Sequence, residues 1–499
     1  MNFSSKKLTI NALSAVLQVV FTALLYFFLY KYLLAKIGVE QLGVWSLILS
    51  FSSIANLANL GLTSGLVKFV AEYLLEKDKT KLGKLIFTST LSMSLLFGVL
   101  SLIILSFAQF FLGYVVEKKF LNIALEILPY SLGSLCINAV GGVFTSVLEG
   151  HQKNYIRNFI YIVSGIIMFG GTVLLTPIYQ LKGVAIAQLI QSIFIFVTAL
   201  LFTVKINQDN KIRYWKWSSE SFKELFNYGY KFQLVSISQL LYEPATKLLL
   251  SRYGGLALLG HYEMATKAVN QFRALLTNAN QVVIPVIAEK SKEGSSSFLQ
   301  SFYVRMNRIL LLITLPLSTV LILATPFISL IWLGSFNDDF MFSMFILIAM
   351  TFVNVMCGPS YFSALGEGRL NVLVIVHISM AIVNIILGLI LGKLFGGHGI
   401  IIAWGIALSG GSLALILNYN KAINIRFSQM FRKQDLSLFI ISAAIIGINT
   451  VVFQLLSSAG LGMKLIIIFL SLLLFLPVII KNDNIRQLKS VIKKKESNV

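Results

Sequence analysis

The sequence predicts an all-α, polytopic membrane protein with about 14 transmembrane helices: two six-helix lobes around a central cavity, followed by two additional C-terminal helices. Three observations support this prediction. The chain is 57% hydrophobic and only 12% charged, about half the charged share of an ordinary globular protein. Apolar runs of about 20 residues, long enough to cross a hydrocarbon core, recur along it. Landmark residues of the first half also return in the second half at a nearly constant offset.

The apolar runs define the predicted spans in chain order. Their approximate limits are 8–35, 42–67, 85–112, 122–148, 156–178, 183–204, 225–251, 256–287, 306–332, 340–364, 371–392, 398–418, 436–456 and 462–480. A transmembrane β-barrel would instead show shorter segments of alternating polarity. The first run follows MNFSSKK and is too long for the core of a signal peptide, so we expect a membrane helix rather than a cleaved leader.

The basic residues indicate the orientation of the chain. Lys and Arg number 41 against 20 Asp and Glu, which gives a formal net charge of +21. Most of them flank apolar spans, where they set topology and meet anionic headgroups, so we expect membrane lipids as partners and no nucleic acid. The basic clusters gather on the inner side when both termini are placed in the cytoplasm.

The spans and loops predict the domain organisation. An N-terminal lobe covers 1–206, a cytoplasmic interfacial linker 207–223, a C-terminal lobe 224–420, two additional helices 434–482, and a basic cytoplasmic tail 483–499. The linker contains YWKW, whose aromatic and basic residues suit the inner membrane surface. A plain loop explains this segment equally well.

An internal repeat relates the two lobes. The matched pairs, at an offset of 216 or 217 positions, are Gly38 and Gly255, Gly43 and Gly260, Trp45 and Tyr262, Gly150 and Gly366, and Gly183 and Gly399. Six spans is an even number, so both halves enter the membrane from the same side. This predicts a parallel repeat, with the substrate path between the halves and alternating access by rocking of one against the other.

Spans seven and eight contain the main candidate site. An ionised side chain near the bilayer centre costs about 2.5–3.5 kcal/mol on insertion scales, so these charges should avoid lipid. The candidate substrate-binding residues there, spaced near three- and four-residue steps, are Lys231, Glu243, Lys247, Glu263, Lys267, Asn270 and Arg273. Such spacing predicts polar stripes that face a hydrated cavity.

Two interpretations of these charges stay open. Glu243 with Lys247 and Glu263 with Lys267 are each four residues apart, so each pair could be purely structural and neutralise itself. Lys231 and Arg273 have no acid three or four residues away in their own spans, which favours a ligand. The planar guanidinium of Arg273 suits phosphate oxygens. Four basic residues against two acidic ones favour an anion.

Spans one and two carry small polar side chains. Gln18, with Asn11, Ser14 and Thr22, follows one face of span one, while Asn56 and Asn59, with Ser46, belong to span two. These groups could hydrogen-bond to sugar hydroxyls, or they could simply let helices pack closely. No catalytic triad, metal-ligand cluster or phosphate-binding loop is present. We therefore expect no catalytic residue, metal or cofactor; a proton or sodium gradient is a candidate energy source.

Three stretches carry a family resemblance: IGVEQLGVWSLILSFSSIANLANLGLTSGLVKFVAEY (37–73), GHQKNYIRN (150–158) and YGGLALLGHYEMATKAVNQF (253–272). They resemble the polysaccharide transporters, the oligosaccharide-lipid flippases of the multidrug/oligosaccharidyl-lipid/polysaccharide exporter superfamily. The resemblance covers about 8–480. Asn59 and Thr246 stand where the family often has acids.

The resemblance implies a function. The chain would move undecaprenyl-pyrophosphate-linked oligosaccharide repeat units from the cytoplasmic to the outer leaflet of the bacterial inner membrane, for O-antigen or capsule assembly. Other polysaccharide assembly proteins would be its partners. The alternatives are a drug or cation antiporter of the same superfamily, for which an acidic site is expected, and a polysaccharide polymerase or ligase. The predicted outer loops are too short for a folded catalytic domain.

Overall fold

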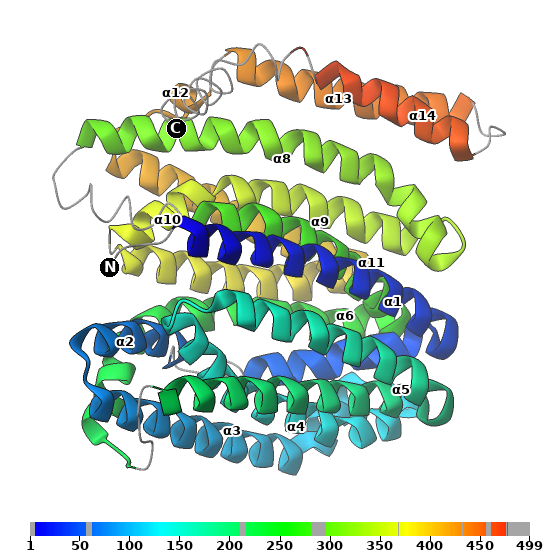
Figure 1. The fold of residues 1–499 in the computed structure, drawn as a ribbon. Coiled ribbons are helices and arrows are strands. Elements are labelled where there is room, and N and C mark those ends of the chain that lie inside the picture. Colours follow the sequence, from blue (N-terminus) through cyan, green and yellow to red (C-terminus); the bar gives the residue numbers. More distant parts are fainter. Residues whose placement is uncertain are drawn as a thin grey trace. The chain divides into compact units, whose positions relative to one another are not determined.

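The computed structural model describes residues 5–55, 62–209, 216–281, 296–367, 369–431, 433–455, 461–475 and 477. Within these ranges every regular element is a helix and none is a strand (Figure 1). In the same ranges, eight helical stretches are long and apolar enough to cross a membrane. The predicted all-α membrane fold is therefore confirmed.

The helices follow the predicted spans closely. In chain order they are α1 Ser5–Ala55, α2 Leu62–Glu76, α3 Lys79–Val115, α4 Lys118–Gly150, α5 Asn154–Asp209, α6 Ser219–Gln281, α8 Ser296–Leu333, α9 Asp338–Met356, α10 Gly358–Gly366, α11 Leu370–Ala422, α12 Phe427–Met430, α13 Lys433–Leu455 and α14 Leu461–Leu472. A 3₁₀ turn at Leu473–Phe475 continues α14.

Each of the longest helices is interrupted where two predicted spans meet. Helix α1 contains Gly38 with φ 77° and ψ 170°, and α6 contains Gly255 with φ 76° and ψ 171°. Glycine adopts this backbone region without strain, whereas other residues rarely occupy it. Helices α5 and α11 are interrupted in the same way at Gln180 (φ 48°, ψ −130°) and Gly396 (φ 61°, ψ −145°).

These interruptions confirm the internal repeat. Gly38 and Gly255 are 217 positions apart and differ by one degree in each torsion angle. Gln180 and Gly396 are 216 positions apart and share the same unusual backbone region. The second match was not visible in the sequence, because a glutamine stands where the other half has glycine.

The chain packs as two compact units. The first unit contains residues 1–271 and 381–404, and the second contains residues 272–380 and 405–499. The predicted boundaries at 206, 224, 420 and 434 stay a prediction. The start of the linker, residues 207–209, continues α5, and its end lies in α6 from Ser219. The basic tail 483–499 lies outside the described residues.

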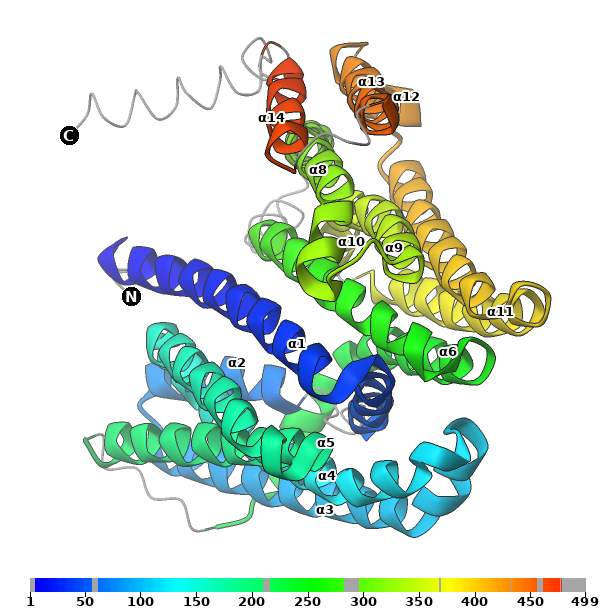
Figure 2. The same cartoon turned by 90° about the vertical axis from the view of Figure 1, so that its right-hand side faces the viewer.

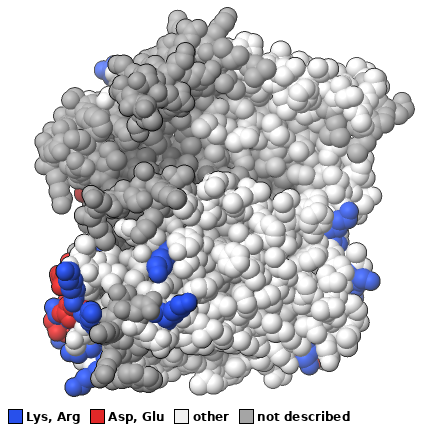
Figure 3. All heavy atoms as spheres, viewed as in Figure 1, with Lys and Arg blue, Asp and Glu red and all other residues white. Residues whose placement is uncertain are grey.

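In the first unit, α4 packs between α3 and α5, and the three run side by side in both ribbon views (Figures 1 and 2). Asp78 starts α3, because its Oδ1 accepts a hydrogen bond of 2.9 Å from the Lys81 amide. The outward face of α3 is strongly apolar, with Leu95, Leu102 and Phe110 each more than half exposed. On the face shown in Figure 3, Lys and Arg lie mainly toward the left and right edges, and the described surface between them is largely uncharged. This distribution suits helices surrounded by lipid.

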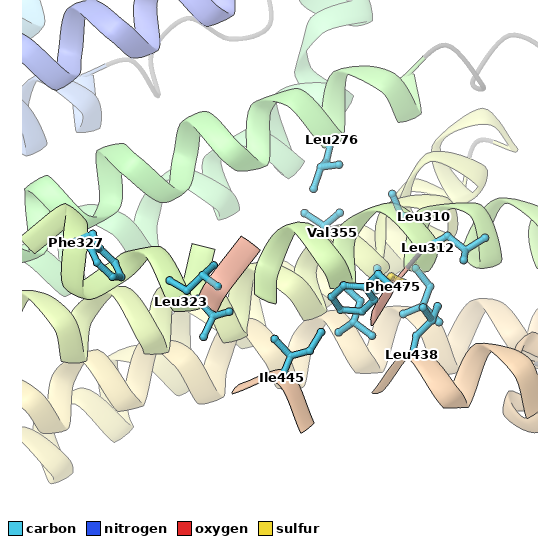
Figure 4. Packing of buried hydrophobic residues seen from close by; sticks show 13 residues of the cluster. Leu276, Leu310, Leu312, Leu323, Phe327, Val355, Leu438, Ile445 and Phe475 are labelled. Atoms are coloured by element: carbon cyan, nitrogen blue, oxygen red, sulfur yellow. The ribbon is translucent and has the colours of Figure 1, made fainter. Parts of the chain in front are cut away.

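In the second unit, the two additional C-terminal helices pack on α8. Leu438 and Ile445 of α13 and Phe475 after α14 belong to the same buried cluster as Leu310 and Leu323 of α8 (Figure 4). Buried apolar contacts of this kind fix α13 and α14 to the bundle rather than leaving them as separate spans.

Candidate functional site

The break at Gly255 brings two charges of α6 together. Lys247 lies before the break and Glu263 after it, and their Nζ and Oε2 atoms are 2.8 Å apart. The side chains are 5% and 0% exposed. Sequence spacing did not predict this pair, because residues 16 positions apart meet only when the helix turns back on itself.

The two pairs predicted from four-residue spacing are also present. Lys247 Nζ lies 3.1 Å from Glu243 Oε1, and Lys267 Nζ lies 3.3 Å from Glu263 Oε1. The four side chains therefore form one continuous chain of alternating charge. Its ends are accessible, since Glu243 is 50% exposed and Lys267 is 29% exposed.

Helix α1 completes the environment of Glu263. Ser46 Oγ donates a hydrogen bond of 2.7 Å to Glu263 Oε2, and Tyr30 OH donates one of 3.2 Å to Oε1. The Lys267 ammonium lies 5.6 Å from the ring centre of Tyr26. Tyr30 was not identified in the sequence, and Ser46 was noted there only as a small polar residue of span two. The internal repeat could have pointed to both residues. Ser46 and Tyr30 stand 217 positions before Glu263 and Lys247, and so are their counterparts in the first half.

The four charges line a cavity of about 270 Å³ in the first unit, called here the charged pocket. Its other walls come from α1, α4 and α5: Tyr26, Tyr30, Trp45, Leu49, Ser131, Leu135, Asn138, Met168, Gln188 and Gln191. The Oγ atom of Ser131 is buried and has no hydrogen-bond partner among the described residues. The pocket therefore offers charged groups, amides and a hydroxyl in an otherwise apolar bundle.

The charges in this pocket balance, which differs from the predicted excess of positive charge. The prediction counted Lys231 and Arg273. The side chain of Lys231 lies outside the described residues, and Arg273 is half-buried in the second unit. Structural pairing thus explains the fully buried Lys247–Glu263 contact, whereas Lys267 and Glu243 remain accessible to a ligand.

The remaining predicted residues are dispersed. Gln18 lies on α1 and lines a second cavity of about 220 Å³. Asn270 is exposed near the end of the first unit. Asn56 and Asn59 lie outside the described residues. Within the described part of the chain, no group of three or more His, Cys, Asp or Glu side chains could hold a metal ion.

Comparison with known families gives one match. The model of a family described as polysaccharide biosynthesis protein matches residues 33–341, more than half of the chain. No curated protein matches the chain.

Three similar solved structures are described as transporters or as a flippase. A lipid II flippase, MurJ, in an inward closed conformation is 19% identical, with a TM-score of 0.68 over 93% of this chain and 98% of that one. An inward-facing multidrug resistance MATE family transporter of the MOP superfamily is 15% identical, with a TM-score of 0.66 over 81% and 94%. A MOP superfamily transporter from Pyrococcus furiosus is 14% identical, with a TM-score of 0.61 over 84% and 96%. At these identities the likeness shows the fold alone.

Proposed function

The chain belongs to the polysaccharide biosynthesis protein family, and on that basis we propose that it is a flippase for undecaprenyl-pyrophosphate-linked oligosaccharides. It would move these repeat units from the cytoplasmic to the outer leaflet of the bacterial inner membrane for surface polysaccharide assembly. The multi-pass helical fold that it shares with MOP superfamily transporters and a lipid II flippase supports a transport role.

The observation behind this proposal is the charged pocket. Charged side chains at membrane depth are costly and usually mark a substrate path. The headgroup of a lipid-linked oligosaccharide is equally costly to move through hydrocarbon, because its sugar hydroxyls and phosphates would lose their hydrogen bonds to water. A polar pocket inside an apolar bundle lowers that cost for the headgroup, while the polyprenyl tail can stay in lipid.

The accessible ends of the charge chain provide the chemistry. The Lys267 ammonium, 29% exposed, can approach phosphate oxygens of the pyrophosphate. The half-exposed Glu243 carboxylate can accept hydrogen bonds from sugar hydroxyls, and the amides of Asn138 and Gln188 can both donate to and accept from them. Glu263, already held by four partners, would keep both lysines in place rather than contact the headgroup.

Reconstitution in vesicles tests the proposal. The purified protein should carry a fluorescently labelled polyprenyl-pyrophosphate oligosaccharide between leaflets many times faster than protein-free vesicles, as measured by quenching with a membrane-impermeant reagent. Lys267→Met should slow this movement strongly. Lys393→Met, which removes an exposed charge outside the pocket, should leave it unchanged.

Two results would reject the proposal. One is a rate of lipid movement equal to that of empty vesicles. The other is uptake of an organic cation such as ethidium, driven by an ion gradient, without any movement of the labelled lipid. The second result would support the drug or cation antiporter instead.

A further inference from the structure

The polar face of α1 has two different environments. At its start, Asn11 Nδ2 donates to the Gln152 carbonyl (3.2 Å) and Asn11 Oδ1 accepts from the Tyr155 amide (3.1 Å). One turn later, Asn158 Nδ2 donates to Ser14 Oγ at 2.9 Å. Asn11 and Ser14 are therefore used to pack α1 against the turn before α5 and its first residues, as the packing interpretation of this face predicted.

The next two turns of α1 differ. Gln18 and Thr22 line the 220 Å³ cavity, called here the α1–α5 pocket. In the described part of the chain, no hydrogen bond involves either side chain. Across the cavity stand Tyr161, Ser164 and Gln191 of α5. Gln191 Nε2 donates to Ser164 Oγ at 3.5 Å, and Ser164 Oγ donates to the Tyr161 carbonyl at 2.9 Å. Among the described residues, the unused hydrogen-bonding groups of this cavity are therefore those of Gln18 and Thr22 on the α1 side.

The lining of the α1–α5 pocket is polar without charge. It combines the amides of Gln18 and Gln191 and the hydroxyls of Thr22 and Ser164 with two tyrosines, Tyr26 and Tyr161. Apolar residues such as Leu25 and Phe169 complete the lining. Amides can donate to and accept from the same hydroxyl groups. Tyrosine rings present flat apolar faces with a polar end. A neutral sugar ring, with hydroxyls at its edge and C–H groups on its faces, matches this lining better than an ion does.

The α1–α5 pocket adjoins the charged pocket. Tyr26, Met168 and Gln191 line both cavities. Each volume is below the 300–1,000 Å³ of typical small-molecule sites, so each fits one part of a larger headgroup. A molecule with a charged part beside a neutral part could occupy both cavities at once.

We propose that the α1–α5 pocket is a subsite for a neutral sugar residue of the transported headgroup, beside the charged pocket that receives its anionic part. This inference rests on the proposed function. It assigns the role of sugar recognition to Gln18, Thr22 and Gln191, and it excludes Asn11 and Ser14 from that role.

A binding experiment with two lipids tests the subsite. The first probe is the polyprenyl-pyrophosphate oligosaccharide extracted from cells that express the protein, and the second is the same polyprenyl pyrophosphate after removal of its sugars. Each is titrated into the purified full chain, and affinity is obtained from the rise in unfolding temperature with lipid concentration. Gln18→Leu and Thr22→Val remove hydrogen-bonding groups at nearly constant size. Gln109→Leu, on the exposed side of α3, is the matched control.

We expect Gln18→Leu and Thr22→Val each to weaken binding of the sugar-bearing lipid by roughly tenfold, the effect of one lost hydrogen bond. Binding of the sugarless lipid should be unchanged, and Gln109→Leu should alter neither. Equal losses for both lipids, or no loss for either, would overturn the subsite. Sugar-dependent binding without transport in vesicles would instead overturn the proposed function alone. Failure of the wild-type chain to bind either lipid would overturn both.

Discussion

Replacing Glu263 by Gln is expected to lower the free energy of unfolding by about 3–5 kcal/mol, the usual cost of removing one member of a buried ion pair. Glu263 is fully buried and lies within 3.3 Å of both Lys247 and Lys267. Without its charge, Lys267 loses its carboxylate partner and Lys247 keeps only Glu243. The folded state then contains lysine charge that the bundle does not compensate.

Glu243→Gln is the matched control for this prediction. It makes the same chemical change beside the same lysine, but the Glu243 side chain is 50% exposed. Water screens such a pair, so we expect a loss of no more than about 1 kcal/mol. Both variants are compared with the wild-type chain by denaturation in sodium dodecyl sulfate. Equal losses for the two variants would show that burial of Glu263 does not matter.

A double-mutant cycle isolates the contact across the break at Gly255. Lys247→Met and Glu263→Gln are measured singly and together. If the 2.8 Å contact holds the two halves of α6 against each other, the double variant should be more stable than the sum of the single losses predicts. The expected coupling is about 0.5–3 kcal/mol. A coupling near zero would assign the loss in Glu263→Gln to Lys267 alone.

Local features of the fold could be predicted from the sequence because they depend on neighbouring residues. Apolar runs gave the helices, and two of the breaks lie at glycines 38 and 255, in the gaps between predicted spans. Four-residue spacing gave the Glu243–Lys247 and Glu263–Lys267 pairs. The Lys247–Glu263 contact could not be found in this way, because it depends on the path of the chain after the break.

The far walls of the two pockets were also beyond the sequence analysis. Tyr161, Gln188 and Gln191 sit on α5, whose charged residues Arg157 and Lys182 line neither pocket. Polar residues in an apolar helix serve packing as often as binding. Only the position of α5 against α1 shows which polar residues serve packing and which line a pocket. Ser14 belongs to the first group and Gln18 to the second.

The repeat contained more information than its landmarks suggested. Ser46 contacts Glu263, which is its own counterpart 217 positions later. A residue can contact its own counterpart only near the axis that relates the two halves. The same symmetry predicts a reciprocal pair of contacts nearby, and the structure contains one. A Cβ on Gly43 would meet the carbonyl oxygen of Leu256, and a Cβ on Gly260 would meet that of Val39.

Gly43→Ala and Gly260→Ala are therefore each expected to destabilise the fold by about 1–3 kcal/mol or more, the range for overpacked sites. The added methyl carbons would lie 2.1 Å and 2.3 Å from backbone oxygens, which cannot turn aside as a flexible side chain can. Gly98→Ala is the control, because nothing lies within 4 Å of its added Cβ and alanine favours a helix over glycine by about 1 kcal/mol. Denaturation of the three variants in sodium dodecyl sulfate measures the difference.

Because both contacts lie at one crossing of α1 and α6, separating the helices for one substitution also makes room for the other. The double variant should then lose less than the sum of the single losses, and full additivity would show that the two contacts yield independently.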